Sequence, residues 1–274
     1  MAQNNKKKRM FEGVLVKMQT EYANPIRYYL NLDTTFIRVN DLLQRKITLT
    51  HTGFSCLNCG ATTPIYRQGF CRNCFFEVPA AADWIMRPEL SQAHLGIEDR
   101  DLAYEEKVQL QPHVVYFALS SGLKVGVTRH TQIPTRWIDQ GAHKAFPIVE
   151  VPNRYLAGIA EVALKEHYND KTNWRLMLTQ TPTEVDMLAE RQKAIQWLPD
   201  EVKPYATQTQ HPTPTELHFP VDQYPQKVQS LNLLTSKSYS GKLVGIKGQY
   251  FIFEDQTVFN VRSHEGHRVK ITLD

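Results

Sequence analysis

The middle of the chain carries its clearest pattern of apolar and polar positions. Residues 113–119 and 123–128 are two apolar runs rich in β-branched and aromatic side chains. Ser120, Ser121 and Gly122 separate them. Two such runs joined by a short polar turn predict a β-hairpin.

Two helices and a third strand are predicted to follow this hairpin. Pro134 suits the first turn of a short helix over residues 135–140, and the apolar run 145–151 is typical of a strand. Asn153 can cap a longer helix that ends near Tyr168. The apolar residues of that helix recur three or four positions apart: Leu156, Ile159, Ala160, Ala163 and Leu164. The predicted order of elements is β-β-α-β-α.

The two ends of the chain repeat one pattern of strands. Residues 11–16 resemble residues 239–244, and residues 46–49 resemble residues 270–273. Between these blocks the matches keep one constant offset: residues 28–30 with 250–252, Asp33 with Asp255, Thr35 with Thr257 and Val39 with Val261. The matched blocks are rich in β-branched and aromatic residues, so they predict two related β-modules.

An isolated module of about 40 residues buries too little surface to be stable alone. We therefore expect the two modules to pack together or on the middle of the chain. One interpretation is a small-barrel nucleic-acid binder with basic side chains at Lys242, Lys247, Arg262, Arg268 and Lys270. The alternative interpretation is a structural clamp that brings the two ends together.

Two further segments have weaker patterns. Residues 183–198 predict an amphipathic helix with core positions at Val185, Leu188, Ile195 and Leu198. Residues 199–226 are rich in Pro, Thr and Gln, which predicts an extended connector.

The composition is that of an ordinary folded protein. Of the 274 residues, 42% are hydrophobic and 22% are charged, which argues against a disordered chain. No apolar run approaches the roughly 20 residues of a membrane span, so we expect no membrane association. The polar N-terminus, with its basic run Lys6 to Arg9, has no apolar core typical of a secretory signal.

The net charge of +4 is unevenly distributed along the chain. Residues 1–80 hold 11 basic and 5 acidic side chains, whereas residues 81–110 hold 3 and 7. A basic surface is the usual footprint of a polyanionic partner, so DNA or RNA is the expected partner. Ordinary charge scatter is the alternative interpretation. The pattern indicates neither protein partners nor an oligomeric state.

All the cysteines lie in one short stretch, at Cys56, Cys59, Cys71 and Cys74. Two C-x2-C pairs at this spacing can place four thiolates at the corners of a tetrahedron around one Zn²⁺. A closed four-thiolate site is structural, because it has no open position for chemistry. We therefore predict structural zinc in a ribbon-like segment over residues 51–80. A disulfide scaffold would spread its cysteines along the chain.

The segment from about residue 113 to 178 resembles the GIY-YIG endonuclease domain, which has the same β-β-α-β-α order. Its first strand matches the family strand that ends in tyrosine, here Tyr116. The YIG triplet of the second family strand corresponds to Lys124-Val125-Gly126. Lys124 therefore replaces the second family tyrosine, which looks like the divergent phage-type branch of the superfamily.

The resemblance also implies roles for individual residues. The family's arginine matches Arg136, its metal-binding glutamate matches Glu161 and its asparagine matches Asn173. In the family, tyrosine aids the nucleophile, glutamate binds Mg²⁺ and arginine stabilises the phosphate. Magnesium or manganese at Glu161 is therefore implied. The catalytic residues implied by resemblance are Tyr116, Lys124, Gly126, Arg136, Glu161 and Asn173.

Plainer interpretations of the same residues stay open. Gln140, which cannot act as a base, falls near the position of a family tyrosine or histidine. Tyr116 can be a strand residue with a hydrogen-bonded hydroxyl, and Glu161 a solvent-facing helix residue paired with Lys165. The sequence leaves three functions open: a nuclease, a non-catalytic RNA or DNA binder, and a protein-interaction adaptor.

Nearly the whole chain also resembles an uncharacterised bacterial family known as domain of unknown function 2797. The resemblance rests on four stretches: residues 56–59, 85–90, 135–142 and 245–250. It implies a bacterial, cytoplasmic protein and supplies no activity.

Together the patterns predict an α+β fold in six segments. Related small β-modules at the two ends are packed around a zinc-ribbon-like knuckle and a β-β-α-β-α, GIY-YIG-like domain. The expected function is that of a nucleic-acid-interacting zinc protein, with metal-dependent phosphodiester cleavage as one reading of its central domain. The segments are residues 1–50, 51–80, the acidic ordered connector 81–112, 113–180, the helix and connector 181–226, and 227–274.

Overall fold

The computed structural model describes residues 9–33, 35–206 and 213–273, and it is a mixed α+β fold with several sheets. Its contacts divide the chain into two compact units. The first, called the β unit, runs to Phe75 and resumes at Phe219, and the second, called the α/β unit, spans Phe76–His218. The basic residues Lys6 to Lys8 lie outside the described residues. None of the helices described is long and apolar enough to cross a membrane.

The β unit contains two modules with the same order of elements. Each has a strand, a hairpin, a 3-10 turn and a last strand, as the sequence repeat predicts. The N-terminal module has β1 (Arg9–Val14), β2 (Gln19–Glu21), β3 (Arg27–Leu32), β4 (Thr35–Arg38), η1 (Val39–Leu42) and β5 (Lys46–Phe54). The C-terminal part has β10 (Gln229–Ser230), α8 (Leu233–Ser236), β11 (Ser238–Lys247), β12 (Tyr250–Phe253), β13 (Thr257–Asn260), η7 (Arg262–His264) and β14 (His267–Leu273).

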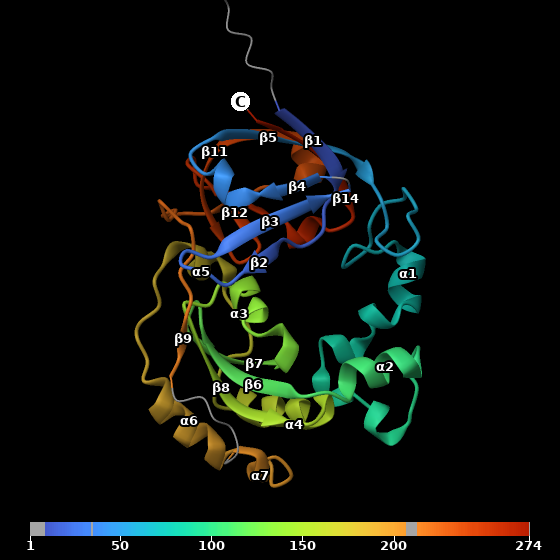
Figure 1. Ribbon diagram of the computed structural model, residues 1–274, viewed down its shortest axis with the longest axis vertical. Helices are drawn as coiled ribbons and strands as arrows, with labels where there is room; N and C mark the ends of the chain where they lie inside the picture. Colours follow the sequence, from blue (N-terminus) through green and yellow to red (C-terminus); the bar gives the residue numbers. More distant parts are fainter. Residues whose placement is uncertain (1–8, 34, 207–212, 274) are drawn as a thin grey trace, which may run out of the picture. The chain divides into compact units, whose positions relative to one another are not determined.

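The first strand of each module pairs with the last strand of the other. β1 is antiparallel to β14, and β11 is antiparallel to β5. β5 and β14 pair with each other inside a sheet ordered β1-β14-β5-β11-β12-β13-β10. Figure 1 shows β1 and β5, from the start of the chain, grouped with β11 and β14, from its end. The expectation that the two modules pack together is therefore confirmed. The exchange matters for stability, because β1 has its backbone partners in β14 and β5 has its partners in β14 and β11, all in the other module.

The two hairpins of the β unit differ in how much they bury. β12 and β13 are buried on both faces, since Phe251 to Phe253 and Thr257 to Phe259 are all at most 8% exposed. β3 and β4 alternate instead, with an inner face formed by Tyr28, Leu30 and Ile37. Their outer face is open to solvent.

The α/β unit is built on an antiparallel sheet ordered β7-β6-β8-β9. Its strands are β6 (His113–Leu119), β7 (Leu123–Arg129), β8 (Lys144–Val151) and β9 (Thr215–Glu216). Every residue of β6 is buried, because this strand has a neighbour on each edge. The continuous apolar run that predicted this strand reflects that central place.

The helices of the unit confirm the predicted β-β-α-β-α order. They are α2 (Leu102–Gln109), α3 (Thr135–Asp139), α4 (Arg154–Lys165), α5 (Trp174–Thr179), α6 (Met187–Gln196) and α7 (Lys203–Ala206). Asn153 caps α4 as predicted, since its Oδ1 accepts a hydrogen bond of 2.9 Å from the Leu156 amide. Ala157, Ala160 and Leu164 of α4 lie in one core with Val115 of β6.

The helix predicted over residues 183–198, α6, is shorter than the periodicity predicts. It begins at Met187 rather than at residue 183, because the Asp186 carboxylate accepts the amides of Leu188 and Ala189 and caps it. Met187 is buried and Leu188 is 48% exposed, so the prediction that Leu188 is a core residue is wrong.

The connector predicted over residues 199–226 is only partly extended. It contains α7 and the strand β9, which pairs with β8. Val202 and Ala206 are buried in the core of the α/β unit, which explains why this Pro-rich stretch is ordered there. Residues 207–212 of the connector lie outside the described residues.

The acidic stretch before β6 folds against the start of α4. It contains four 3-10 turns, η2 (Pro79–Ala81), η3 (Asp83–Ile85), η4 (Pro88–Leu90) and η5 (Ala93–Leu95), followed by α2. The closest approach is at Gly158, where an added Cβ would lie 2.2 Å from the Glu89 backbone nitrogen. A glycine is therefore required where α4 crosses η4.

Replacing Gly158 with alanine is expected to destabilise the protein by about 2–4 kcal/mol, because backbone atoms cannot yield as a side chain can. The gain in helix propensity, about 1 kcal/mol, offsets only part of this loss. Urea unfolding followed by circular dichroism measures the difference. Gly122→Ala is the matched control, since its Cβ would meet no atom within 4 Å. Equal stability of the two variants would contradict the packing described.

A buried histidine predicts acid sensitivity of the α/β unit. His113 is fully buried, and burial lowers its pKa to about 4. Its Nδ1 lies 2.7 Å from the Gln111 carbonyl oxygen, and its Nε2 has no hydrogen-bond partner among the residues described. The unfolded chain, with a histidine pKa of about 6.5, binds a proton first as the pH falls. Stability is therefore lost between about pH 6.5 and pH 4.

This loss is expected to reach about 3 kcal/mol for His113 alone. His113→Asn keeps an N–H donor for the Gln111 carbonyl and cannot be protonated, so its stability should fall less between pH 7 and pH 4. Urea midpoints at several pH values measure both proteins, and contributions from the other histidines cancel in the comparison. Parallel curves for the two proteins would show that His113 is not responsible.

Candidate functional site

Tyr116 lies at the centre of the predicted site and is completely buried on β6. Its hydroxyl donates a hydrogen bond of 3.0 Å to Oε1 of Gln140, at the end of α3. Gly126 is its direct partner on β7, and a Cβ there would lie 2.9 Å from the hydroxyl oxygen. Gly126 therefore leaves the space that the ring occupies. The interpretation of Tyr116 as a strand residue with a bonded hydroxyl is confirmed.

The charges around Tyr116 come from β7, α3 and α4. Burial raises the pKa of Tyr116, Arg136 lowers it and Glu161 raises it. These side chains are therefore close enough for their charges to affect one another. Lys124 is only 5% exposed, and burial together with Arg136 lowers its pKa to about 8, whereas Glu161 raises it. Tyr116, Lys124, Arg136 and Glu161 are called the charged cluster below.

Glu161 is the carboxylate of the charged cluster. Its side chain is 11% exposed, and its Oε2 lies 3.5 Å from Nζ of Lys165, one turn further along α4. The predicted pairing with Lys165 is confirmed, whereas the interpretation of Glu161 as solvent-facing is wrong. Burial raises the pKa of Glu161, and Lys165 opposes this effect. The helix turns this face toward the unit because Gly158 and Ala160, at neighbouring positions, pack into the interior.

Glu89 is a second carboxylate near Glu161, and no pattern in the sequence indicated it. Glu89 raises the pKa of Glu161, which places the two carboxylates near each other. Its Oε1 pairs with Nε of Arg87 at 3.3 Å, while its Oε2 is buried and accepts no hydrogen bond from the part of the chain described. The packing of η4 on Gly158 brings Glu89 to this position. No spacing in the sequence relates residue 89 to residue 161.

Arg154 fastens the start of α4 to the acidic stretch. Its Nε and Nη2 donate to the carbonyls of Trp84 and Ile85 at 3.1 and 2.7 Å, and its guanidinium lies 5.6 Å from the Trp84 ring centroid. Burial lowers its pKa to about 10, so it remains a cation at neutral pH. It also lowers the pKa of Glu161, which makes it a third cation near that carboxylate.

Asn173 occupies a different position from the rest of the predicted site. It is exposed and caps α5, because its Oδ1 accepts the amides of Arg175 and Leu176 at 3.1 and 3.3 Å. Its own amide donates to the Ser121 hydroxyl. Among the described contacts, none joins its side chain to the charged cluster, and its catalytic role stays a prediction.

The four cysteines form a second candidate site, in the β unit. The sulfur atoms of Cys56, Cys59, Cys71 and Cys74 all lie within 4.8 Å of one another, so the group can bind a metal ion such as zinc. The Cys71 amide donates to Sγ of Cys56 at 3.3 Å. Burial opposes ionisation of Cys56, but backbone amides lower its pKa to about 6. Thiolate at this position favours metal binding.

The loop that carries the cysteines is fastened to the β unit at both of its turns. The Ser55 amide donates to the Gly266 carbonyl, and the Leu57 amide donates to that of Gly69. An added Cβ at Gly266 would lie 2.8 Å from the Gly69 carbonyl oxygen. The second pair of cysteines enters α1 (Arg72–Glu77), whose buried residue is Cys74. The knuckle is therefore held beside the start of β14.

Comparison with known proteins gives one match. The model of a family described as "Protein of unknown function (DUF2797)" matches residues 44–269. This range includes the four cysteines, Glu89 and the whole charged cluster. No curated protein and no solved structure matches the chain.

Proposed function

Because the chain belongs to the family described as protein of unknown function (DUF2797), which names no activity, we propose a function from the sites themselves. The proposal is metal-dependent hydrolysis of phosphodiesters in nucleic acid by the charged cluster, in a protein whose four cysteines hold a structural zinc ion. The order β-β-α-β-α and the contact of Tyr116 with Gly126 support a divergent GIY-YIG-like unit.

One observation carries the proposal: a buried carboxylate among cations. Lys124 and Arg136 are suited to bind phosphate, but Glu161 beside them would repel it. A surface that only binds phosphate gains nothing from such a carboxylate. A divalent cation between carboxylate and phosphate would turn the repulsion into attraction.

The residues present fit a hard divalent ion such as Mg²⁺. Glu161 and the buried, unpartnered Oε2 of Glu89 offer carboxylate oxygens, which such ions prefer. When bound, the ion supplies charge to the phosphate and activates water. Arg136 then stabilises charge on the phosphate oxygens. Lys124, whose pKa is about 8, can hold or release a proton near neutral pH.

The experiment is a cleavage assay on the purified full-length protein. Labelled single-stranded and duplex DNA and RNA are incubated with Mg²⁺ or Mn²⁺, and products are resolved on denaturing gels. We expect cleavage that requires the added ion and falls when Arg136 is replaced by methionine. Intact polymers in every combination would contradict the proposal.

The second candidate is binding of nucleic acid without cleavage. It is favoured by the environment of Tyr116, whose hydroxyl is fully buried and already donates to Gln140, so it cannot readily reach a water molecule. Burial also raises its pKa, which makes a proton harder to remove. Salt-dependent binding to a site that includes Lys124 and Arg136, with every polymer left intact, is the result that selects this candidate.

A further inference from the structure

The open face of the N-terminal hairpin carries aromatic and cationic side chains. Tyr29 and Phe36 lie on neighbouring strands with ring centroids 5.0 Å apart and planes inclined by 16°, so they stack. Phe36 is 60% exposed. Arg38 is the direct partner of Tyr29 across the ladder, and Arg27 lies two residues before it on the same face. These four side chains are called the aromatic face.

The C-terminal module shows that this exposure is not a necessity of the fold. In its corresponding hairpin, β12–β13, the side chains on both faces are buried, and Phe251 and Phe259 are each 1% exposed. Within one repeated architecture, one hairpin closes its outer face, whereas the other leaves Phe36 exposed and Tyr29, stacked on it, half-buried. Exposed aromatic side chains that gather in one patch mark a binding surface.

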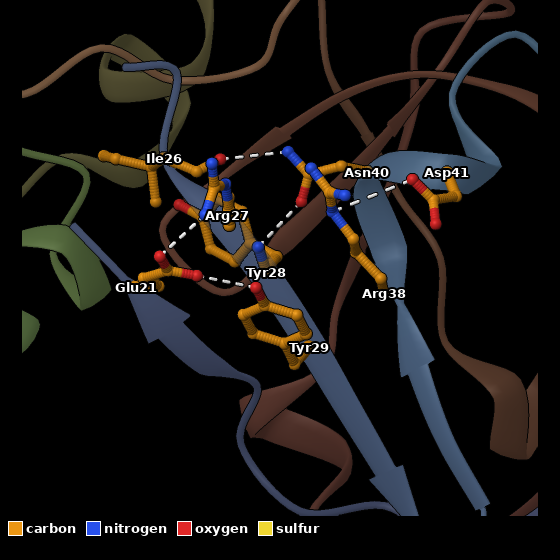
Figure 2. A network of polar contacts seen from close by, with 8 residues as sticks. All are labelled: Glu21, Ile26, Arg27, Tyr28, Tyr29, Arg38, Asn40 and Asp41. Carbon is orange, nitrogen blue, oxygen red and sulfur yellow. Dashed lines mark hydrogen bonds and ion pairs between the residues drawn. The ribbon is translucent and has the colours of Figure 1, made fainter. Parts of the chain in front are cut away.

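A polar network holds the aromatic face in place before any ligand arrives (Figure 2). The Glu21 carboxylate accepts from Nη1 of Arg27 at 2.8 Å and from the Tyr29 hydroxyl at 2.7 Å. Arg38 pairs with Asp41 at 3.7 Å. Asn40 bonds the Tyr28 amide and the Ile26 carbonyl, so β3 is fixed to the 3-10 turn that follows β4. The Tyr29 ring and the Arg27 guanidinium are therefore joined through one carboxylate.

The charge of the β unit indicates a polyanionic occupant. Its residues, 1–75 and 219–274, hold 18 basic and 9 acidic side chains, whereas the remaining 143 residues hold 14 and 19. The ion pairs of Arg27 and Arg38 are solvent-exposed, so each contributes little to stability and is easily exchanged for a phosphate. An arginine has five N–H donors, and only Nη1 of Arg27 contacts Glu21.

We propose that the aromatic face binds single-stranded nucleic acid, with bases stacked on Tyr29 and Phe36 and phosphates beside Arg27 and Arg38. Stacking requires free base faces, which a duplex hides inside its helix. This surface lies in the β unit, whereas the charged cluster lies in the α/β unit, so the inference does not depend on the cleavage proposed above.

The test is fluorescence anisotropy of a labelled oligo(dT) or oligo(U) with the full-length protein, in buffer without added divalent cations. Tyr29→Ala with Phe36→Ala should weaken binding about 10- to 100-fold, because stacking of each base is lost. Trp197→Ala is the matched control, since Trp197 is an exposed aromatic residue stacked on His167 in the α/β unit. An unlabelled duplex of equal length should compete poorly.

A second variant tests the arginines. Arg27→Gln with Arg38→Gln should lower the slope of log K against log salt by about 1.4, since each phosphate contact contributes about 0.7 for single strands. Because the buffer contains no added divalent cation, the assay measures binding separately from the proposed metal-dependent cleavage. The proposal is overturned if no oligonucleotide binds at low salt, or if the Tyr29 and Phe36 double variant binds unchanged. A further result would overturn the proposal in favour of a peptide-binding face: the wild-type protein binds a protein partner but no oligonucleotide, and the Tyr29 and Phe36 double variant no longer binds that partner.

Discussion

Replacing Glu161 with glutamine is expected to lower metal-dependent cleavage by about 100- to 1,000-fold while leaving the fold intact. The amide keeps the shape of the side chain but loses the negative charge that would hold a divalent ion. Since burial already raises the pKa of Glu161, the fold gains little from the charge, and a neutral side chain should be tolerated. Initial cleavage rates at saturating Mg²⁺ measure the effect, with thermal unfolding as the check on the fold.

The matched control for this variant is Glu166→Gln. Glu166 is exposed at the end of the same helix, and it is not among the groups that shift the pKa of Lys124 or Tyr116. Its replacement should leave cleavage unchanged. The cleavage rate of Glu89→Gln should lie between the rates of the Glu161→Gln and Glu166→Gln variants if both carboxylates hold the ion. Full cleavage by Glu161→Gln would rule out the metal role proposed for this residue.

Removing one cysteine of the knuckle is expected to abolish stoichiometric metal binding. The wild-type protein should carry about one zinc ion per chain, because its four sulfur atoms lie within 4.8 Å of one another. Cys71→Ser removes a buried ligand, and a structural zinc ion contributes about 10–16 kcal/mol of binding free energy in small zinc domains. Elemental analysis of the purified proteins measures the metal content.

The structural result of that change should be local. The loop around Cys56 to Cys74 has little core of its own, so without metal it should become sensitive to proteases. The strands of the β unit keep their own backbone pairing and should resist cleavage. Ser55→Ala is the control, since Ser55 contacts Gly266 through its backbone amide. A wild-type protein without bound metal, or a Cys71→Ser protein that keeps it, would contradict the assignment.

Several features could be predicted from the sequence because they depend on near neighbours. The apolar run 113–119 became a buried central strand, and Asn153 became the cap of α4. The two C-x2-C pairs came together because their spacing closes a short loop. The repeat at the two ends also appeared as predicted, since hairpins and strands follow from alternation and turn residues.

The presence of a helix was easier to predict than its first residue and its buried face. The periodicity over residues 183–198 indicated a helix, but the helix begins only at Met187, where Asp186 caps it. The face that packs on the core carries Met187, Ala194 and Leu198, and Leu188 lies beside that face in solvent. Competing cap residues differ by about 1 kcal/mol, so tertiary packing decides between them.

By itself the sequence determined the β-β-α-β-α order that begins at residue 113, the repeated β-modules at the two ends and the four-cysteine group. Only the tertiary structure decided that Glu89 lies near Glu161, because that contact depends on a 3-10 turn packing against Gly158. It alone also decided that β12 and β13 are closed on both faces while Phe36, stacked on Tyr29, remains exposed. Local patterns report which side chains share a face, whereas the layer that covers that face comes from distant parts of the chain.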